Sequence, residues 1–259
     1  MSRIVVFDTE TTSLEKPFVY NIGYVIYDTE ENRKLIEHDF VVEQIWHNRE
    51  LFTTAYYADK REGYVADMRA RKVKMEKLGY ITQFMAREFK DFEVEAAFAY
   101  NSPFDDKVFK YNCDWFKIIN PFDNIPIYDI RGYVFRKIAY TNEYKEFCDK
   151  NEYFTDSGNY STTAEVVYRF LTQNTDFIED HTALSDSLIE LEILWECVAR
   201  GCEWAKEYKT YRSVQRIVSK RLELTDADGI KHNFPYNKIT VYAEKDNRKR
   251  IVLKNLDRA

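Results

Sequence analysis

The chain begins with a pattern typical of a buried strand. Residues 4–7 form an unbroken apolar run, IVVF, directly before Asp8, and a run without polar alternation is typical of a strand buried on both faces. The ranges 21–27 and 35–42 also have strand-like patterns, and the sequence DTEEN between them is a turn signal. We therefore expect a strand over 3–8 followed by a hairpin, which gives three antiparallel strands at the start of the chain.

The middle of the chain alternates helical patterns with short apolar segments. In the charged stretch 64–92, apolar residues recur at helical spacing at Met75, Leu78, Ile81, Met85 and Phe89. We expect further helices over 105–112, 131–150, 161–171 and 183–200, and short strands over 96–100 and 125–128. Ser161 is the expected N-cap of one helix, and Gly201 is the expected stop of the last. The stretch 49–71 has no clear period.

The C-terminal part of the chain has a different pattern. A helix is expected over 204–221, and an Asp-Gly turn lies between alternating segments in LELTDADGIKHNF. The ranges 239–243 and 250–253 resemble the strands of a second hairpin. We therefore expect a domain over 1–202 and an appendage of one helix and hairpins over 203–259.

Composition describes an ordered globular chain. Its 259 residues are 45% hydrophobic and 32% charged, with only 7 Gly and 5 Pro, which argues against a disordered or linker-rich protein. The 20 Tyr and 18 Phe could supply base-stacking surfaces, although core packing is the more common role for any one ring.

Cysteine usage and the apolar runs indicate the compartment. The chain has no CxxC pair among its cysteines and no zinc-like His and Cys spacing, so reduced structural thiols are expected at Cys113, Cys148, Cys197 and Cys202. The N-terminus lacks a signal-peptide pattern, and no apolar run approaches the roughly 20 residues of a membrane span. We expect a cytoplasmic protein without a membrane partner.

Charge is unevenly distributed along the chain. The net charge of −6 argues against a nucleic-acid partner, because phosphate binding usually needs basic patches. From Lys206 onward, however, there are 14 Lys and Arg against 7 Asp and Glu. This basic appendage could hold a nucleic-acid backbone, or it could simply be a solvated charged surface.

Three separated segments carry the candidate chemistry. Asp8 and Glu10 lie two residues apart at the end of the first strand, so their carboxylates point to the same face. Asp105 follows a short apolar strand at the start of a helix, where free backbone amides favour an anion. His181 and Asp186 flank the entrance of the long helix over 183–200. Each segment alone has an ordinary structural explanation, and only their coincidence suggests one site.

Four carboxylates in one pocket require cations at neutral pH. Like charges a few ångströms apart raise each other's pKa unless positive charge intervenes. Hard divalent ions prefer oxygen ligands, and a histidine beside them suggests hydrolysis. The residues therefore indicate a metal-dependent hydrolase.

The same segments carry a family resemblance. The sequences FDTETT, YNIG, AYNSPFD and HTALSD occur in this order, and together they resemble the motifs of the DEDDh (DnaQ-like, RNase T-type) 3′-to-5′ exonuclease superfamily. The similarity extends from Arg3 to about Arg200. It implies an RNase H-like α/β fold, in which a mixed sheet is flanked by helices.

The resemblance also implies roles for the five residues. Two Mg²⁺ or Mn²⁺ ions would be held by the four acids, with Asp8 bridging both, Glu10 and Asp186 completing one, and Asp105 holding the other directly or through water. His181 would take a proton from the attacking water. The expected product is a 5′-mononucleotide.

Substrate contacts are expected beside these residues. By similarity, Leu14 and Phe18 are candidates for stacking on the terminal bases, with core packing as the alternative. Asn101 could orient a phosphate or support the turn between strand and helix. The other expected contacts are Thr11, Thr12 and Phe104. Ser13 departs from the Gly common in the family, and the stretch 49–77 does not align.

The sequence therefore predicts a metal-dependent 3′-to-5′ exonuclease acting on single-stranded DNA or frayed 3′ ends. An exoribonuclease that trims RNA ends or short oligonucleotides is the alternative, because no feature of the sequence indicates whether the site contacts the 2′-hydroxyl group of RNA. Two non-enzymatic readings stay open: a nucleic-acid-binding module of the same fold, and a regulatory nucleotide-binding protein. A polymerase or a second copy of the chain is a further partner that the resemblance allows.

Overall fold

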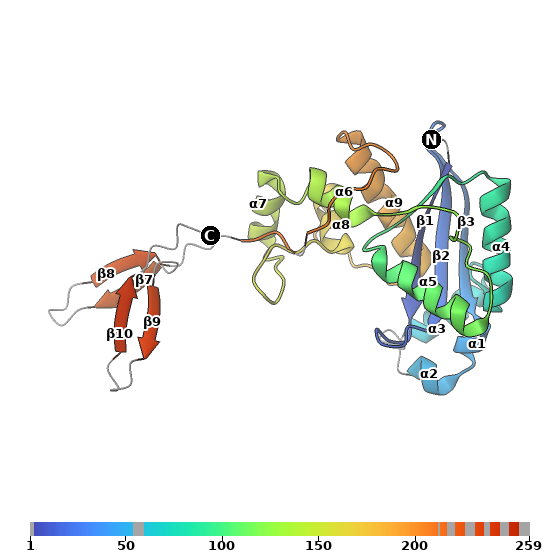
Figure 1. The fold of residues 1–259 in the computed structure, drawn as a ribbon, viewed down its shortest axis with the longest axis horizontal. Helices are drawn as coiled ribbons and strands as arrows, with labels where there is room; N and C mark the ends of the chain where they lie inside the picture. Colours follow the sequence, from blue (N-terminus) through green and yellow to red (C-terminus); the bar gives the residue numbers. More distant parts are fainter. Residues whose placement is uncertain are drawn as a thin grey trace. The chain divides into compact units, whose positions relative to one another are not determined.

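The computed structural model describes residues 3–53, 60–211 and 213–216, together with four strands of the C-terminal part (Figure 1). The chain divides into two compact units, Met1–Val214 and Gln215–Ala259. The sequence predicts a division after Cys202, and the described residues between that position and Val214 belong to the first unit. Each unit is described separately below.

A six-stranded mixed sheet forms the centre of the first unit. Its strand order is β4-β3-β2-β1-β5-β6, and the strands span Arg3–Thr11 (β1), Val19–Asp28 (β2), Arg33–Val42 (β3), Lys74–Glu76 (β4), Ala96–Ala99 (β5) and Ile127–Asp129 (β6). The strands β1, β2 and β3 are antiparallel, which confirms the three predicted strands. The parallel neighbours are β5 beside β1, β6 beside β5 and β4 beside β3.

Helices cover both faces of this sheet (Figure 1). In chain order they are α1 (Glu43–Trp46), α2 (Arg49–Thr53), α3 (Arg61–Arg69), α4 (Leu78–Asp91), α5 (Pro103–Phe116), α6 (Ile130–Lys137), α7 (Asn142–Asn151), α8 (Ala164–Thr172) and α9 (Ala183–Ala199). Alternate residues of β1 enter two hydrophobic clusters. Val5 and Phe7 pack with α4 and α5, whereas Ile4 and Val6 pack with α6, α8 and α9. The unbroken apolar run of β1 therefore reflects a strand buried on both faces.

The structure corrects three helix predictions. The helix predicted over 64–92 is divided into α3 and α4, because Arg71 takes a left-handed conformation (φ 60°) and residues 74–76 form the edge strand β4. The helix predicted over 131–150 is likewise divided into α6 and α7, and Thr141 caps α7 by accepting a hydrogen bond from Tyr144 N at 3.2 Å. The N-cap of α8 is Thr163, which accepts from Val166 N, rather than Ser161.

The helix predicted over 204–221 is wrong for its described residues up to 216, where no helix forms. We call residues 203–211 the strap. It is anchored to α6 and β6 instead: Lys206 N donates to Tyr133 Oη at 3.1 Å, and the Thr210 hydroxyl donates to Asp129 at 2.8 Å. These contacts compete with helical hydrogen bonding, so a charged sequence that suggests a helix is held as an irregular segment.

The second unit contains two hairpins among its described residues. Strands β7 (Arg221–Thr225) and β8 (Lys231–Pro235) pair antiparallel, as do β9 (Ile239–Ala243) and β10 (Lys249–Leu253). The two predicted hairpins are confirmed. The predicted Asp-Gly turn lies outside the described residues.

Two further sequence expectations concern thiols and membranes. All four cysteines are free and buried, in agreement with the expected reduced thiols. Within the described part of the chain, none of the helices combines the length and apolar character needed to cross a bilayer.

Gly23 allows α9 to lie directly on β2. A Cβ atom added at Gly23 would lie 2.0 Å from Leu184 N and 2.2 Å from Ala183 C. Both are backbone atoms at the start of α9, so they cannot move aside without displacing the helix. Ser187 completes the contact, since its hydroxyl donates to Gly23 O at 3.1 Å.

We predict that Gly23→Ala lowers the free energy of unfolding by about 1–3 kcal/mol or more, because the added methyl group overpacks this contact. The matched control is Gly63→Ala on α3, where an added Cβ meets no atom within 4 Å and the helical position should gain about 0.5–1 kcal/mol. Urea unfolding of both variants checks the prediction. Equal stabilities for the two variants would contradict it.

Candidate active site

The site is built around the carboxyl end of β1. Asp8 and Glu10 are two residues apart, and the register of β1 against β2 shifts directly after Glu10. Thr9, between them, points to the opposite face and donates its hydroxyl to Asp105 Oδ1 at 2.6 Å. Asp105 lies in the first turn of α5 and is buried. Asp8 and Glu10 therefore lie on one face of β1, and Thr9 holds Asp105 by a hydrogen bond on the opposite face.

A buried hydrogen-bond network fixes the entrance of α9. Asn21 Oδ1 on β2 accepts from Ala183 N and from Tyr64 Oη, both at 2.8 Å. Asn21 Nδ2 donates to Asp39 at 2.5 Å. Because Ala183 is the first residue of α9, this network sets where the helix starts and therefore where His181 and Asp186 lie.

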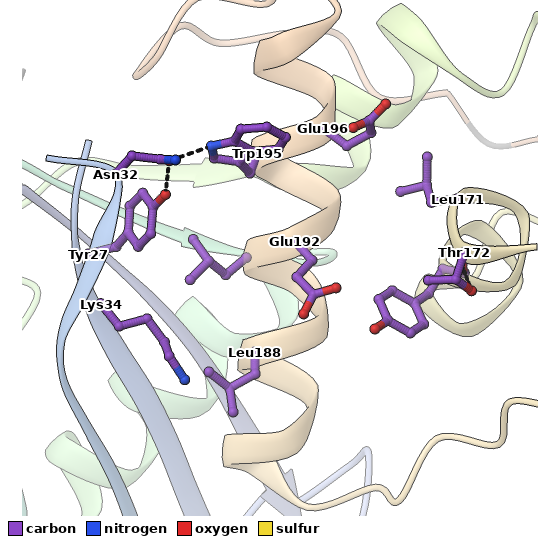
Figure 2. Close-up of a pocket in the computed structure, with 11 residues that line it drawn as sticks. Tyr27, Asn32, Lys34, Leu171, Thr172, Leu188, Glu192, Trp195 and Glu196 are labelled. Atoms are coloured by element: carbon purple, nitrogen blue, oxygen red, sulfur yellow. Dashed lines mark hydrogen bonds between the residues drawn. The ribbon is translucent and has the colours of Figure 1, made fainter. Parts of the chain in front are cut away.

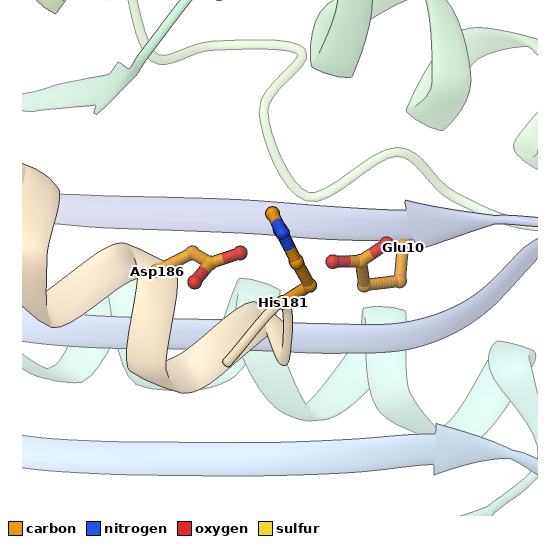
Figure 3. Close-up of side chains that lie close together, drawn as sticks. All are labelled: Glu10, His181 and Asp186. Atoms are coloured by element: carbon orange, nitrogen blue, oxygen red, sulfur yellow. The ribbon is translucent and has the colours of Figure 1, made fainter. Parts of the chain in front are cut away.

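Glu10, His181 and Asp186 come together at this entrance (Figure 3). One ligand atom from each residue lies within 4.8 Å of the others. Asp186 is 7% exposed, and among the described residues no donor reaches its Oδ1 atom. A buried carboxylate oxygen without a partner is costly, and oxygen donors are what Mg²⁺ and Mn²⁺ prefer. The residues therefore fit a divalent cation.

The electrostatics of the acids also favour positive charge. Burial raises the pKa of Asp8 to about 7. Burial, and then the charge of Asp8, raise the pKa of Glu10 to about 9 and that of Asp186 to about 10. The pKa of Asp105 is raised well above its usual value for the same two reasons. The charge of Asp8 therefore contributes to the raised pKa of all three other acids. The four acids form one electrostatic cluster.

His181 has the opposite shift. Burial lowers its pKa, and the nearby charge of Lys60 lowers it further. Its backbone is left-handed, with φ 50°, and its Nδ1 atom lies 3.7 Å from Glu179 Oε2. A neutral imidazole can accept a proton at neutral pH.

A fifth acid, Glu190, lies beside the predicted four. It is 4% exposed, and its Oε2 atom accepts a hydrogen bond from Tyr100 N at 3.0 Å. Burial raises its pKa well above the usual value, and the charges of Asp8 and Asp105 contribute. Its spacing of four residues from Asp186 placed both on one helix face, so the sequence contained a signal for it.

Two further charged residues border the site. Lys60 donates from its amino group to Asp180 O, next to His181. Its positive charge partly opposes the rise in the pKa of Glu10 and of Asp186, which burial and the charge of Asp8 cause. Burial raises the pKa of Glu179 to about 7. Lys60 precedes α3 in a stretch without hydrophobic period, so no sequence signal pointed to it.

The predicted substrate contacts of the β1–β2 loop have different exposures. Leu14 is 75% exposed, whereas Phe18 is buried against the rings of Tyr111 and Trp115. The environment of Phe18 matches the core-packing alternative. Trp115, which the sequence analysis did not single out, is 62% exposed.

The other predicted contacts lie around the acids. Thr11 is half-buried and Thr12 is buried. Asn101 is exposed and left-handed (φ 62°), and its backbone N–H donates to Asp129 Oδ1 at 2.9 Å. Phe104 is half-buried against the core. A role of these residues in substrate binding stays a prediction.

Comparisons with known proteins identify the fold. No protein-family model and no curated protein matches the chain. Among solved structures, the nuclease domain of 3′hExo, a DEDDh family member bound to rAMP, matches with a TM-score of 0.55 and 16% identity over 82% of this chain and 98% of that chain. A 3′-exonuclease solved for its 3′-end specific recognition of a histone mRNA stem-loop matches with a TM-score of 0.56 and 13% identity, over 91% and 92% of the two chains. The chain thus has the RNase H-like α/β fold of the DEDDh exonucleases.

Proposed function

We propose that the protein is a metal-dependent 3′-to-5′ exonuclease that removes 5′-mononucleotides from single-stranded nucleic acid. The observation that carries this proposal is the approach of Glu10, His181 and Asp186 to within 4.8 Å of one another, beside Asp8 and Asp105. Acids in this number and state of burial favour bound cations. The DEDDh fold supports a phosphodiester as the bond that is cleaved.

In this proposal the four acids bind metal ions. Asp8, Glu10, Asp105 and Asp186 would hold two Mg²⁺ or Mn²⁺ ions, and Asp186 Oδ1 is available because no described donor occupies it. When bound, such ions stabilise the negative charge that develops on the phosphate and its leaving oxygen. Asp105 would be oriented by the hydroxyl of Thr9, whose hydrogen bond fixes the carboxylate.

His181 would be the general base. One ring nitrogen accepts a proton from a water molecule as the water oxygen bonds to phosphorus. The bond between phosphorus and the 3′ oxygen breaks, and this oxygen takes up a proton from solvent water. The shortened strand therefore ends in a 3′-hydroxyl, and the nucleotide leaves with a 5′-phosphate. The lowered pKa of His181 keeps the imidazole neutral and able to accept this proton at neutral pH.

DNA is our preferred substrate, and RNA is the second candidate. One observation favours RNA: the matching 3′hExo nuclease domain binds rAMP, and the other matching exonuclease recognises an mRNA stem-loop. Matched DNA and RNA strands of one sequence, labelled at the 5′ end, distinguish the two.

We predict that Asp8→Asn reduces the rate of 3′-end shortening by at least about 10³-fold and His181→Ala by about 10²–10⁴-fold, since they remove an ion ligand and the base. The control is Asp91→Asn, which changes an acid paired with Arg87 at 3.5 Å on the surface of α4 and should leave the rate nearly unchanged. The assay follows 5′-labelled strands with Mg²⁺ and with chelator. Near-normal shortening by Asp8→Asn would refute the assignment, as would intact strands with the wild type.

We also predict that the metal-free protein loses stability as the pH rises from 7 to 9. In this window the folded protein keeps protons on Glu10 and Asp186, whose pKa values are raised to about 9 and about 10, whereas the unfolded chain has released them. The unfolded state therefore binds fewer protons, and the free energy of unfolding falls as the pH rises.

Thermal unfolding in chelator checks this pH dependence, and Mn²⁺ should raise Tm most at pH 9. Asp186→Asn removes one titrating group and should reduce the pH dependence. A Tm in chelator that is constant or rises over this window would contradict the prediction.

A further inference from the structure

A hollow of about 790 Å³ lies at the carboxyl ends of β5 and β6. One side is formed by residues 101–103 and by Asp106, which directly follows Asp105, and the other by residues 207–210 of the strap. Neighbouring strands are about 4.8 Å apart, and β6 is two strands from β1 in the sheet, so β6 lies about 10 Å to the side of β1.

A second hollow, of about 510 Å³, lies along the strap and shares Glu207, Tyr208 and Lys209 with the first. We call the two hollows together the strap groove. Half of the residues lining the second hollow are aromatic, and all but one of the others are cations: the rings are Phe135, Tyr140, Tyr208 and Tyr211, and the cations are Arg136, Lys206 and Lys209. This composition is unlike that of the whole chain, which has a net charge of −6.

The strap is held firmly by the residues beneath it. A Cβ added at Gly132 on α6 would lie 2.3 Å from Tyr208 O, so glycine allows the strap backbone to lie against the helix. The Tyr208 ring packs on Tyr133 with centroids 4.8 Å apart. Together with the hydrogen bonds of Lys206 N and Thr210, these contacts fix the shape of the groove.

The rings and cations of the second hollow are accessible and adjacent. Tyr140 is 45% exposed and Tyr211 is 43% exposed, with ring centroids 5.9 Å apart. Lys209 Nζ lies 5.0 Å from the Tyr211 ring, and Lys145 Nζ lies 5.9 Å from the Tyr140 ring. Exposed rings beside mobile cations are the arrangement that binds unpaired bases and their phosphates.

Three acids line the first hollow. Two of them have partners, and the third, Glu207, also lines the second hollow. Asp129 accepts hydrogen bonds from Asn101 N, Arg131 N and Thr210 Oγ1. Asp106 is paired with Lys110. These partners offset the negative charge of the two acids, so they oppose a nearby phosphate less than unpaired acids would.

Another hollow of the first unit lacks this character. It lies between α8, α9 and the β2–β3 turn and measures about 550 Å³ (Figure 2). Its charged lining residues are Lys34, Glu192 and Glu196, so acids outnumber cations. In the second hollow of the strap groove, three cations face one acid, Glu207. A polyanion would therefore bind that second hollow in preference to this one.

We propose that the strap groove binds the nucleotides 5′ to the one being removed, with bases against Tyr140 and Tyr211 and phosphates near Lys209, Lys206 and Arg136. This inference rests on the proposed exonuclease function. A dinucleotide held at the acids would not extend to the second hollow, whereas a longer strand would occupy both hollows. The enzyme is therefore specific for oligonucleotides over dinucleotides.

The test uses the double variant Lys206→Glu/Tyr211→Ser, whose two residues line the second hollow and not the first, and a matched control, Lys74→Glu/Tyr80→Ser. Lys74 and Tyr80 are exposed, and Lys74 lies on β4 at the opposite edge of the sheet. Cleavage of single-stranded DNA of 2 and 12 nucleotides is measured with Mg²⁺. Binding of the labelled 12-mer is measured by fluorescence anisotropy in chelator, which reports on the groove without turnover.

We expect a 12-mer KM at least about tenfold below the dinucleotide KM, and a rise of about tenfold in the 12-mer KM and Kd in the strap variant. The dinucleotide rate and the control variant should match the wild type. Equal KM values for both lengths, or an unchanged 12-mer Kd in the strap variant, would overturn the inference. Cleavage would still support the proposed nuclease activity in that case, and the groove would instead suit a protein partner. A wild type that binds the 12-mer through the groove but cleaves neither strand would refute the proposed function alone.

Discussion

The burial of several carboxylates at one end of β1, together with the repulsion among them, is the constraint around which this structure is organised. Asp8, at the end of a strand covered on both faces, contributes to the raised pKa of Glu10, Asp105, Asp186 and Glu190. Bringing acids together in this way opposes folding unless protons or cations compensate. This cost is concentrated at one end of β1, and the proposed hydrolytic site with divalent ions would compensate for it.

The sheet holds the acids against their repulsion through contacts with the helix entrances. Asn21 binds the first backbone N–H of α9, and Gly23 lets that helix approach β2 at backbone distance. Thr9 holds Asp105 from the opposite face. Each of these contacts lies within one or two residues of an element end, where a small displacement would move one of the candidate site residues. Preorganisation of the site is therefore a property of the sheet and its helix junctions.

Much of this arrangement could be predicted from the sequence because its signals are local. The unbroken apolar run of β1 and the apolar pattern of α9 identify buried elements, and the motif residues lie at their ends. Other features depend on contacts between distant segments. The strap looks helical by composition, yet Tyr133 and Asp129 hold it otherwise. Lys60 reaches the site from a stretch without period. Glu190 could have been found from its helical spacing alone.

Anomalous diffraction from crystals of the protein soaked in Mn²⁺ would show whether cations occupy the carboxylate cluster. We expect one or two anomalous peaks about 2.0–2.2 Å from carboxylate oxygens of Asp8 and Asp186, and loss of the peaks in Asp8→Asn. Saturating Mn²⁺ with no peak among these acids, while their side chains keep the arrangement described above, would contradict the claim that cations balance the carboxylate cluster.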